Sequence, residues 1–157
     1  MHVHHVDTEQ YLTSICQLIS EGHQVTIPVR GNSMSPFLTD GRDRVLLTPV
    51  PERISRGDIV LFRRKSGQYI LHRIISVKQD GRGGACYYMR GDAQQTEEGA
   101  ILRCQICALA GPVMRKGVWL TLHDPQVLFF RHIWWRRWFP RSFFILMWRK
   151  IRQYRNT

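Results

Sequence analysis

Residues 59–77 read IVLFRRKSGQYILHRIISV, two apolar runs on either side of a short polar turn. Val, Ile and aromatic residues favour strands, and Lys65-Ser66-Gly67 is short enough to close a hairpin between them. Further runs of this kind, divided by Gly, Pro and Asp, lie near 24–29, 44–47, 85–90, 101–109 and 117–122. The sequence therefore predicts a mainly β fold, with a compact and mostly antiparallel β domain over residues 24–122.

The segment before this domain predicts one short helix. Asp7 and Gln10 have the spacing of a capping box, and apolar residues then recur at helical spacing until Gly22 offers a stop. Residues 1–23 are therefore predicted to form an N-terminal helical segment.

The segment after the domain, residues 123–157, differs in composition. Asp124-Pro125 is typical of a helix start, Pro140 should interrupt that helix, and a second amphipathic piece resumes at Arg141. The chain carries a net charge of +11 over 157 residues, of which the ten Lys and Arg and one Asp of residues 115–157 supply +9. A basic amphipathic helical tail is therefore predicted.

Three roles of this tail remain open. Residues 125–157 could lie on an anionic membrane surface, with Trp rings at the headgroups and arginines on phosphates. They could also pack their aromatic side chains over the β domain, or bind nucleic acid. The membrane is favoured, and nucleic acid is the least favoured because basic charge alone does not read bases.

Targeting signals and cysteines bear on location. No apolar window approaches the roughly 18 residues that span a bilayer, and residues 1–7 lack the apolar core of a signal peptide. We therefore expect a cytoplasmic protein, with any membrane contact peripheral and on the inner face, and with its cysteines reduced. Cys104-Gln105-Ile106-Cys107 is one CxxC without a second pair, which predicts a core strand and not a metal site. No cofactor is expected.

The loop after the first predicted strand carries a candidate nucleophile. Gly31 lets the backbone turn sharply and Pro36 fixes the exit, so Ser33 should be held on a loop outside the sheet. A serine nucleophile needs a base within hydrogen-bond reach, and His72 is the candidate. Alone, each residue also fits an ordinary turn or a buried core histidine, and only their combination with other motifs indicates catalysis.

Four short motifs supply that combination, namely GNSMSP at 31–36, RGDIVLF at 56–62, YILHRII at 69–75 and RGDAQ at 90–94. In order and spacing they resemble the conserved boxes of the signal-peptidase clan of serine peptidases, over residues 24 to about 110. In that clan the Ser-Met box supplies the nucleophile and the later strand supplies a Lys or His base. With His72 at that place, the chain is similar to the endoplasmic-reticulum, archaeal and spore-former signal peptidases.

The resemblance implies a catalytic machinery. Ser33 would attack a peptide carbonyl while His72 accepts its proton, and an acid would orient the imidazole. Asp92 and Glu98 are both candidates for that acid, with Asp92 slightly favoured. The Ser33 backbone N–H would form the oxyanion hole, and Asn32 is its candidate second donor because Gly31 stands where many relatives carry a hydroxyl residue. We expect kcat/KM to rise through an apparent pKa near that of free imidazole.

The resemblance also suggests a substrate. The clan binds an extended peptide as an added strand, so Met34, Pro36 and Ile70 are candidate substrate-binding residues. Strand residues around Ser33 and His72 are expected to line a shallow apolar cleft that favours cleavage after Ala, Gly or Ser, namely Val25, Ile27, Val29, Ile59, Leu61, Ile70 and Ile74.

The other branches of the clan fit less well. Too few residues precede Ser33 for the DNA-binding domain of a LexA-type repressor, and no membrane anchor is found. The predicted function is a serine endopeptidase that removes a leader or propeptide from a cytoplasmic precursor. The alternative is a non-catalytic peptide-binding or membrane-surface module on the same fold.

Overall fold

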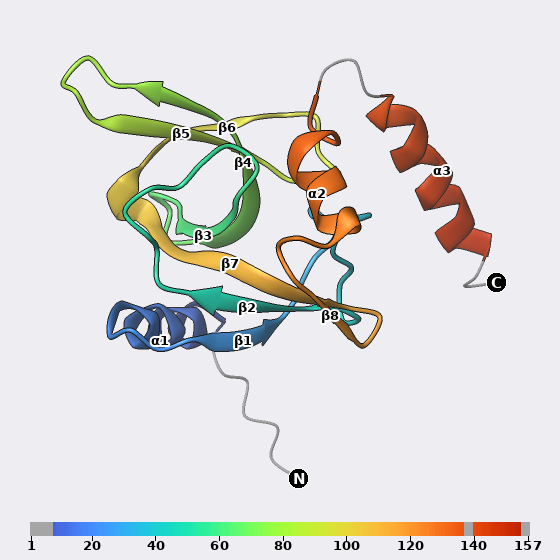
Figure 1. The fold of residues 1–157 in the computed structure, drawn as a ribbon, viewed down its shortest axis with the longest axis horizontal. Helices are drawn as coiled ribbons and strands as arrows, with labels where there is room; N and C mark the ends of the chain where they lie inside the picture. Colours follow the sequence, from blue (N-terminus) through green and yellow to red (C-terminus); the bar gives the residue numbers. More distant parts are fainter. Residues whose placement is uncertain (1–7, 137–139, 155–157) are drawn as a thin grey trace, which may run out of the picture.

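An antiparallel sheet forms the body of the protein. Figure 1 shows the computed structural model, which describes residues 8–136 and 140–154. The eight strands lie in the order β1-β2-β7-β3-β4-β5-β6, with β8 paired to β7, and the prediction of a mainly antiparallel β fold is confirmed. The strands are β1 Val25–Pro28, β2 Arg44–Thr48, β3 Ile59–Arg63, β4 Tyr69–Gln79, β5 Ala85–Arg90, β6 Glu98–Leu102, β7 Ile106–Arg115 and β8 Val118–Leu120.

The β3–β4 hairpin forms where the sequence predicts it. The Arg64 N–H donates to the Gln68 carbonyl at 2.8 Å. Gly67 has a φ of +94°, a backbone conformation that side chains disfavour. In the ladder that follows, Val60 lies opposite His72 and Ile59 opposite Arg73. Because side chains alternate along a strand, His72 and Arg73 point to opposite faces of the sheet.

The predicted strand at 101–109 is wrong in one respect, because a 3₁₀ turn, η1 Arg103–Gln105, divides it into β6 and β7. The Gln105 side chain accepts a hydrogen bond from the Leu102 N–H at 3.0 Å, and Arg103 donates to the Pro51 carbonyl at 2.6 Å. These polar side chains draw the backbone out of the ladder. Cys104 is therefore exposed in η1, and only Ile106 and Cys107 of the CxxC belong to a strand.

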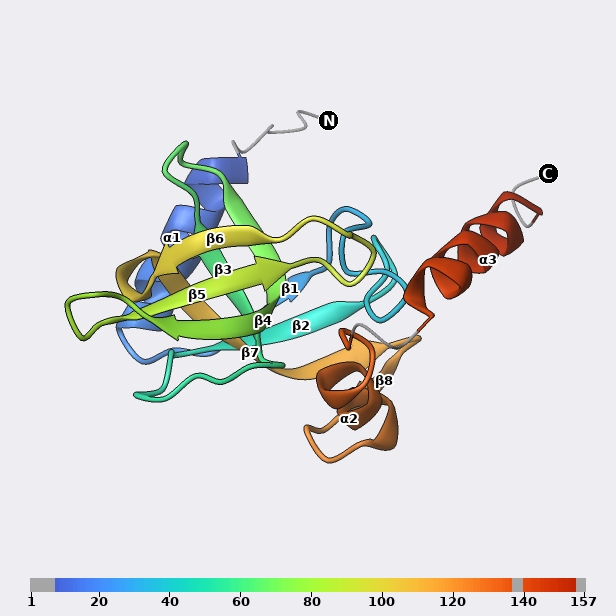
Figure 2. The same cartoon turned by 90° about the horizontal axis from the view of Figure 1, so that it is seen from above.

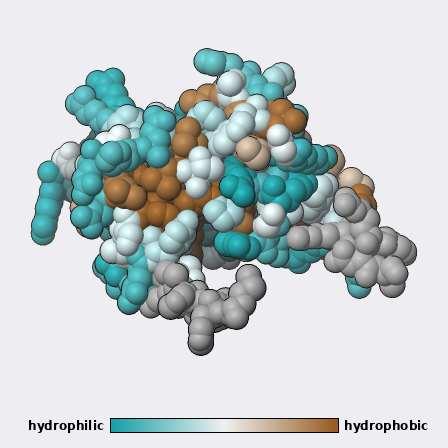
Figure 3. All heavy atoms as spheres, turned by 90° about the horizontal axis from the view of Figure 1, so that it is seen from below, coloured by the Kyte–Doolittle hydropathy of each residue, from teal (hydrophilic) through white to brown (hydrophobic). Residues whose placement is uncertain are grey.

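The N-terminal helix, α1 Thr8–Ser20, packs against the sheet. Ile15 and Ile19 are buried there, and the turn that follows the helix contains Gly22, which has a φ of +94°. Asp7 of the predicted capping box lies outside the described residues. Figure 3 views the side of the molecule where α1 and β1 lie, and hydrophobic residues gather on part of that face.

The tail forms two helices, α2 Pro125–His132 and α3 Arg141–Tyr154. The Asp124 side chain caps α2 by accepting from the Gln126 N–H at 2.9 Å, as predicted. The first helix ends earlier than the expected break at Pro140, because the chain already turns at Ile133–Arg136. Within residues 8–136 and 140–154, no helix is long and apolar enough to cross a membrane.

The first tail helix belongs to the core. Val127, Phe130 and Trp134 are buried in the same cluster as Met34 and Phe37 of the Ser33 loop. The Phe37 and Phe130 rings lie 4.7 Å apart between centroids. Of the roles considered for the tail, α2 and Trp134 therefore show packing against the β domain. This packing holds them beside the candidate site.

Candidate functional site

One buried ion pair joins three of the four motifs. Arg73 on β4 donates to both carboxylate oxygens of Asp92, at 2.8 and 2.7 Å, and its remaining nitrogen donates to the Gly57 carbonyl at 2.9 Å. Arg73 and Asp92 are 2% and 3% exposed. A buried bidentate pair of this kind fixes the relative positions of the segments that carry it.

The fourth motif, the Ser33 loop, is attached to the segment that carries Asp92. The Ala93 N–H donates to the Ser33 carbonyl at 2.8 Å, and the Trp134 indole N–H donates to the Asp92 carbonyl at 2.8 Å. A Cβ at Gly91 would lie 2.5 Å from the Ser33 carbonyl oxygen, closer than such atoms approach. Glycine is therefore required where the Gly-Asp motif meets the loop.

The Gly91 contact gives a testable prediction. Gly91→Ala should push the Ser33 loop away and lower the free energy of unfolding by about 1–3 kcal/mol, as overpacking does. Gly81→Ala is the matched control because a Cβ there meets nothing within 4 Å, and it should change stability by less than about 0.5 kcal/mol. Urea unfolding of both variants measures the difference. Equal stabilities would contradict the close approach of the loop.

His72 is buried in the sheet next to Glu98. It is 2% exposed, and its Nδ1 has no hydrogen-bond partner among the described residues. Glu98 Oε2 lies 4.0 Å from that Nδ1. Arg64 holds the Glu98 carboxylate by donating from both Nε and Nη2, so the carboxylate is fixed beside the imidazole.

The two candidates for the orienting acid, Asp92 and Glu98, have different partners in the structure. Both Asp92 oxygens are taken by Arg73, which points to the face of the sheet opposite His72. Glu98, at the start of β6, is the carboxylate that lies beside His72.

Burial changes the titration of His72. Removal from water is the main cause that lowers the pKa of His72, which is about 4 overall. The negative Glu98 and Asp92 oppose this shift, and the positive Arg64 adds to it. The Arg64 hydrogen bonds lower the pKa of Glu98, which keeps this carboxylate charged at neutral pH. His72 is therefore a neutral imidazole at pH 7, and the expectation of a value near that of free imidazole is corrected downward.

Ser33 and His72 lie in adjoining segments. Arg73 pairs with Arg90 in the antiparallel β4–β5 ladder, so His72, which precedes Arg73, lies next to Gly91, which follows Arg90. Gly91 in turn packs against Ser33. Within the described part of the chain, no hydrogen bond joins Ser33 to His72. Catalytic hydrogen bonds are often long without substrate and tighten when it binds.

The predicted oxyanion donors lie on the open side of the loop. Gly31 has a φ of +78°, and Asn32 is exposed at the edge of a groove. Among the described residues, no acceptor is bound to the Ser33 N–H. This N–H can therefore donate to a bound group.

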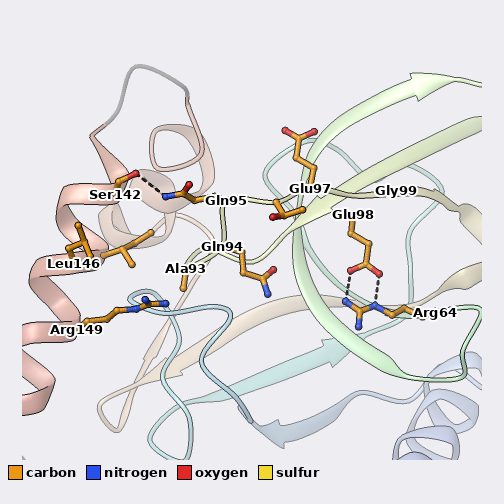
Figure 4. Close-up of a pocket in the computed structure, with 12 residues that line it drawn as sticks. Arg64, Ala93, Gln94, Gln95, Glu97, Glu98, Gly99, Ser142, Leu146 and Arg149 are labelled. Atoms are coloured by element: carbon orange, nitrogen blue, oxygen red, sulfur yellow. Dashed lines mark hydrogen bonds and ion pairs between the residues drawn. The ribbon is translucent and has the colours of Figure 1, made fainter.

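Two grooves run along α3. The larger lies against residues 93–99, and only the smaller borders the Ser33 loop, through Asn32, Ser35 and Pro36, whereas Ser33 and His72 line neither groove. The larger has a volume of about 820 Å³ and includes Glu98 and Arg64, whereas the smaller, of about 350 Å³, includes Asn32 and Pro36. Figure 4 shows Arg64 and Glu98 at one end of the larger groove and α3 at the other. Both grooves share three residues, Ala93, Ile145 and Arg149, so they continue one another along α3.

The predicted substrate-binding residues separate in the structure. Pro36 lines the smaller groove, whereas Met34 is 2% exposed in the core and Ile70 packs on the cluster around Phe62. The predicted apolar cleft is wrong for most of its members, which are buried because the strands pack their inward side chains against each other. The buried ones are Ile27, Val29, Ile59, Leu61 and Ile74.

The sequence prediction gave no role to three arginines at the candidate site. Arg73 lies in a quoted motif without an assigned role, although a charge within an apolar strand signals a buried partner. Arg64 and Arg149 also had no assigned role. Only the register of β6 and the position of α3 bring these two side chains to the grooves.

The comparisons with known proteins add no family assignment. The chain matches no protein-family model, and a search of the curated proteins finds no match either.

Proposed function

We propose that the protein is a serine endopeptidase of the signal-peptidase type, with Ser33 as nucleophile, His72 as general base and Glu98 as the orienting acid. The observation that carries the proposal is the convergence of the four motifs. The Arg73–Asp92 pair joins three of them, and the Ala93–Ser33 hydrogen bond attaches the fourth. The sequence resemblance and this convergence support the same set of residues.

The residue chemistry suits peptide hydrolysis. His72 Nδ1 faces Glu98, which leaves Nε2 to accept the proton of Ser33 Oγ as that oxygen attacks the substrate carbonyl carbon. The Ser33 N–H stabilises the oxyanion, and His72 then gives the proton to the leaving amine. Water, activated in the same way, releases the acyl group from Ser33. A neutral imidazole at pH 7 can perform the first transfer.

The grooves support a peptide substrate. Both run along α3 and share Ala93, and the smaller one borders the Ser33 loop at Asn32, Ser35 and Pro36. We propose that an extended leader or propeptide segment of a cytoplasmic precursor lies there, and that cleavage follows Ala, Gly or Ser. Incubation of the purified chain with a proteome-derived peptide library, followed by mass spectrometry of the new termini, tests this. A preference for cleavage after Arg, Lys or Phe would contradict the specificity.

The pH dependence of cleavage provides a second test. Because the pKa of His72 is about 4, kcat/KM should rise with pH through a limb near 4 and stay flat from about pH 5.5 to 8. Loss of the Arg64 charge in Arg64→Met should move the limb to higher pH, and Glu98→Gln should move it lower.

Lys65→Met is the control for that pair. It removes a neighbouring exposed charge from the β3–β4 turn and should leave the limb in place. Rates for the four proteins on one library-selected peptide, from pH 3 to 8, give the comparison. Identical limbs in Arg64→Met and Glu98→Gln would remove His72 from the role of base.

The alternative is a peptide-binding module without catalysis. Two observations favour it, the absence of a Ser33–His72 hydrogen bond in the described structure and the presence of Gly31 where many clan members have a hydroxyl residue. A chain that retains library peptides without cleaving them would establish this alternative.

A further inference from the structure

One side of helix α3 carries apolar residues that are exposed to solvent. Phe143, Met147 and Ile151 recur at intervals of four residues and are 64%, 42% and 48% exposed. A surface helix of a globular protein normally buries such a stripe. On the opposite side Ile145 is buried in the core cluster, so the orientation of α3 is set by contacts with the domain.

Those contacts hold the inner side of α3 against the site. The Gln95 amide donates to Ser142 Oγ at 3.2 Å, and Trp148 and Arg149 line the smaller groove. Figure 2 shows α3 standing out beyond the sheet and α2, at the edge of the molecule. The outward stripe is therefore accessible to a large, flat partner.

The charge of the segment restricts the partner. Residues 115–157 carry +9, and the exposed Lys150 lies three residues after Met147, beside the apolar stripe. A second copy of the chain would place like charges together, and a nucleic acid would leave the stripe exposed. An anionic bilayer surface satisfies both features, because apolar side chains enter the acyl boundary while Lys and Arg contact lipid phosphates.

We infer that α3 docks the protein on an anionic membrane surface, with Phe143, Met147 and Ile151 inserted at the headgroup boundary and Lys150 on lipid phosphate. This inference does not rest on the proposed peptidase activity. Because the inner side of the same helix lines the grooves, docking places them beside the membrane. The grooves would then bind their substrate at the bilayer surface.

Vesicle sedimentation of the full chain tests the docking. Binding is expected to vesicles of phosphatidylcholine mixed with phosphatidylglycerol, and to be about tenfold weaker or more with phosphatidylcholine alone. Phe143→Ser with Met147→Ser should weaken binding to the mixed vesicles about tenfold. The matched control, Leu18→Ser with Val77→Ser, removes side chains that are 43% and 41% exposed on α1 and β4, and it should bind as the unaltered chain does.

A charge reversal distinguishes binding to lipid phosphate from binding by apolar insertion alone. Lys150→Glu should weaken binding to the mixed vesicles about tenfold, whereas Lys65→Glu in the β3–β4 turn should not. Urea unfolding checks that all four variants remain folded, as expected for exposed positions. Sedimentation that is equal with both kinds of vesicle, or unchanged in the α3 variants, overturns the inference.

Two other partners would also overturn it. A dimer in analytical ultracentrifugation that the α3 double variant dissociates, without vesicle binding, would assign the stripe to a second copy. Binding to a DNA duplex at the same salt, without vesicle binding, would assign the tail to nucleic acid.

Discussion

Ser33→Ala and His72→Gln should each lower kcat/KM on a library-selected peptide by at least about 10³-fold, because members of one catalytic unit fail together. The Ser33 change removes the attacking oxygen and leaves the half-buried loop in place. His72→Gln keeps a side chain of similar size in the buried position beside Glu98 but removes the general base. The double variant should be no slower than either single variant.

The controls use the same substitutions at exposed positions. Ser66→Ala lies in the β3–β4 turn and His23→Gln follows α1, and both should cleave as the unaltered chain does. Circular dichroism and urea unfolding establish that the two site variants are folded. Full cleavage by folded Ser33→Ala would exclude this serine as the nucleophile, and peptide binding without cleavage by the unaltered chain would support the non-catalytic alternative.

The sheet could be predicted because its signal is local. Apolar runs separated by Gly, Pro and Asp place six strand regions within a few residues of the observed strands, and the short polar turn at Lys65-Ser66-Gly67 forms the expected hairpin. The failure at 101–109 has a specific cause. The hydrogen bond from the Leu102 N–H to the Gln105 side chain interrupts the ladder, and hydrophobic pattern carries no information about such a bond.

The choice between the two acids needed the register of the sheet. His72 and Arg73 are neighbours in sequence, so both lie near the Gly-Asp motif, but strand alternation sends them to opposite faces. Arg73 therefore takes Asp92, and His72 is left beside Glu98. Sequence spacing alone could not distinguish these pairings, because Glu98 reaches His72 only through the pairing of β6 with β5.

Sequence spacing also could not show which side of the tail helix α3 faces the domain. Helical spacing predicts the amphipathic character of α3 but not which side meets the domain. The burial of Ile145 and the Gln95–Ser142 hydrogen bond decide that, and they leave the larger apolar stripe outward. The packing and membrane roles, which were alternatives in the sequence, can thus belong to different parts of one tail.

Removal of either partner of the Arg73–Asp92 pair should lower the free energy of unfolding by about 3–5 kcal/mol, because an uncompensated charge stays buried. Arg73→Met also leaves the Gly57 carbonyl without its donor. Arg73→Met with Asp92→Leu should cost much less than the sum of the single changes, since no isolated charge remains. The control is Arg63→Met, which breaks an ion pair with Glu9 whose side chains are 47% and 49% exposed, and it should cost at most about 1 kcal/mol.

The same variants separate structure from catalysis at Asp92. If Glu98 orients His72, the folded Arg73→Met and Asp92→Leu double variant should keep a limb near or slightly below pH 4, because Glu98 and Arg64 remain beside the imidazole and only the smaller contribution of Asp92 to its pKa is lost. Urea unfolding measures the stability, and the pH dependence of kcat/KM measures the base. A double variant that is as stable as the unaltered chain but has lost its activity would return Asp92 to the catalytic unit, since the rate would then depend on Asp92 and the stability would not.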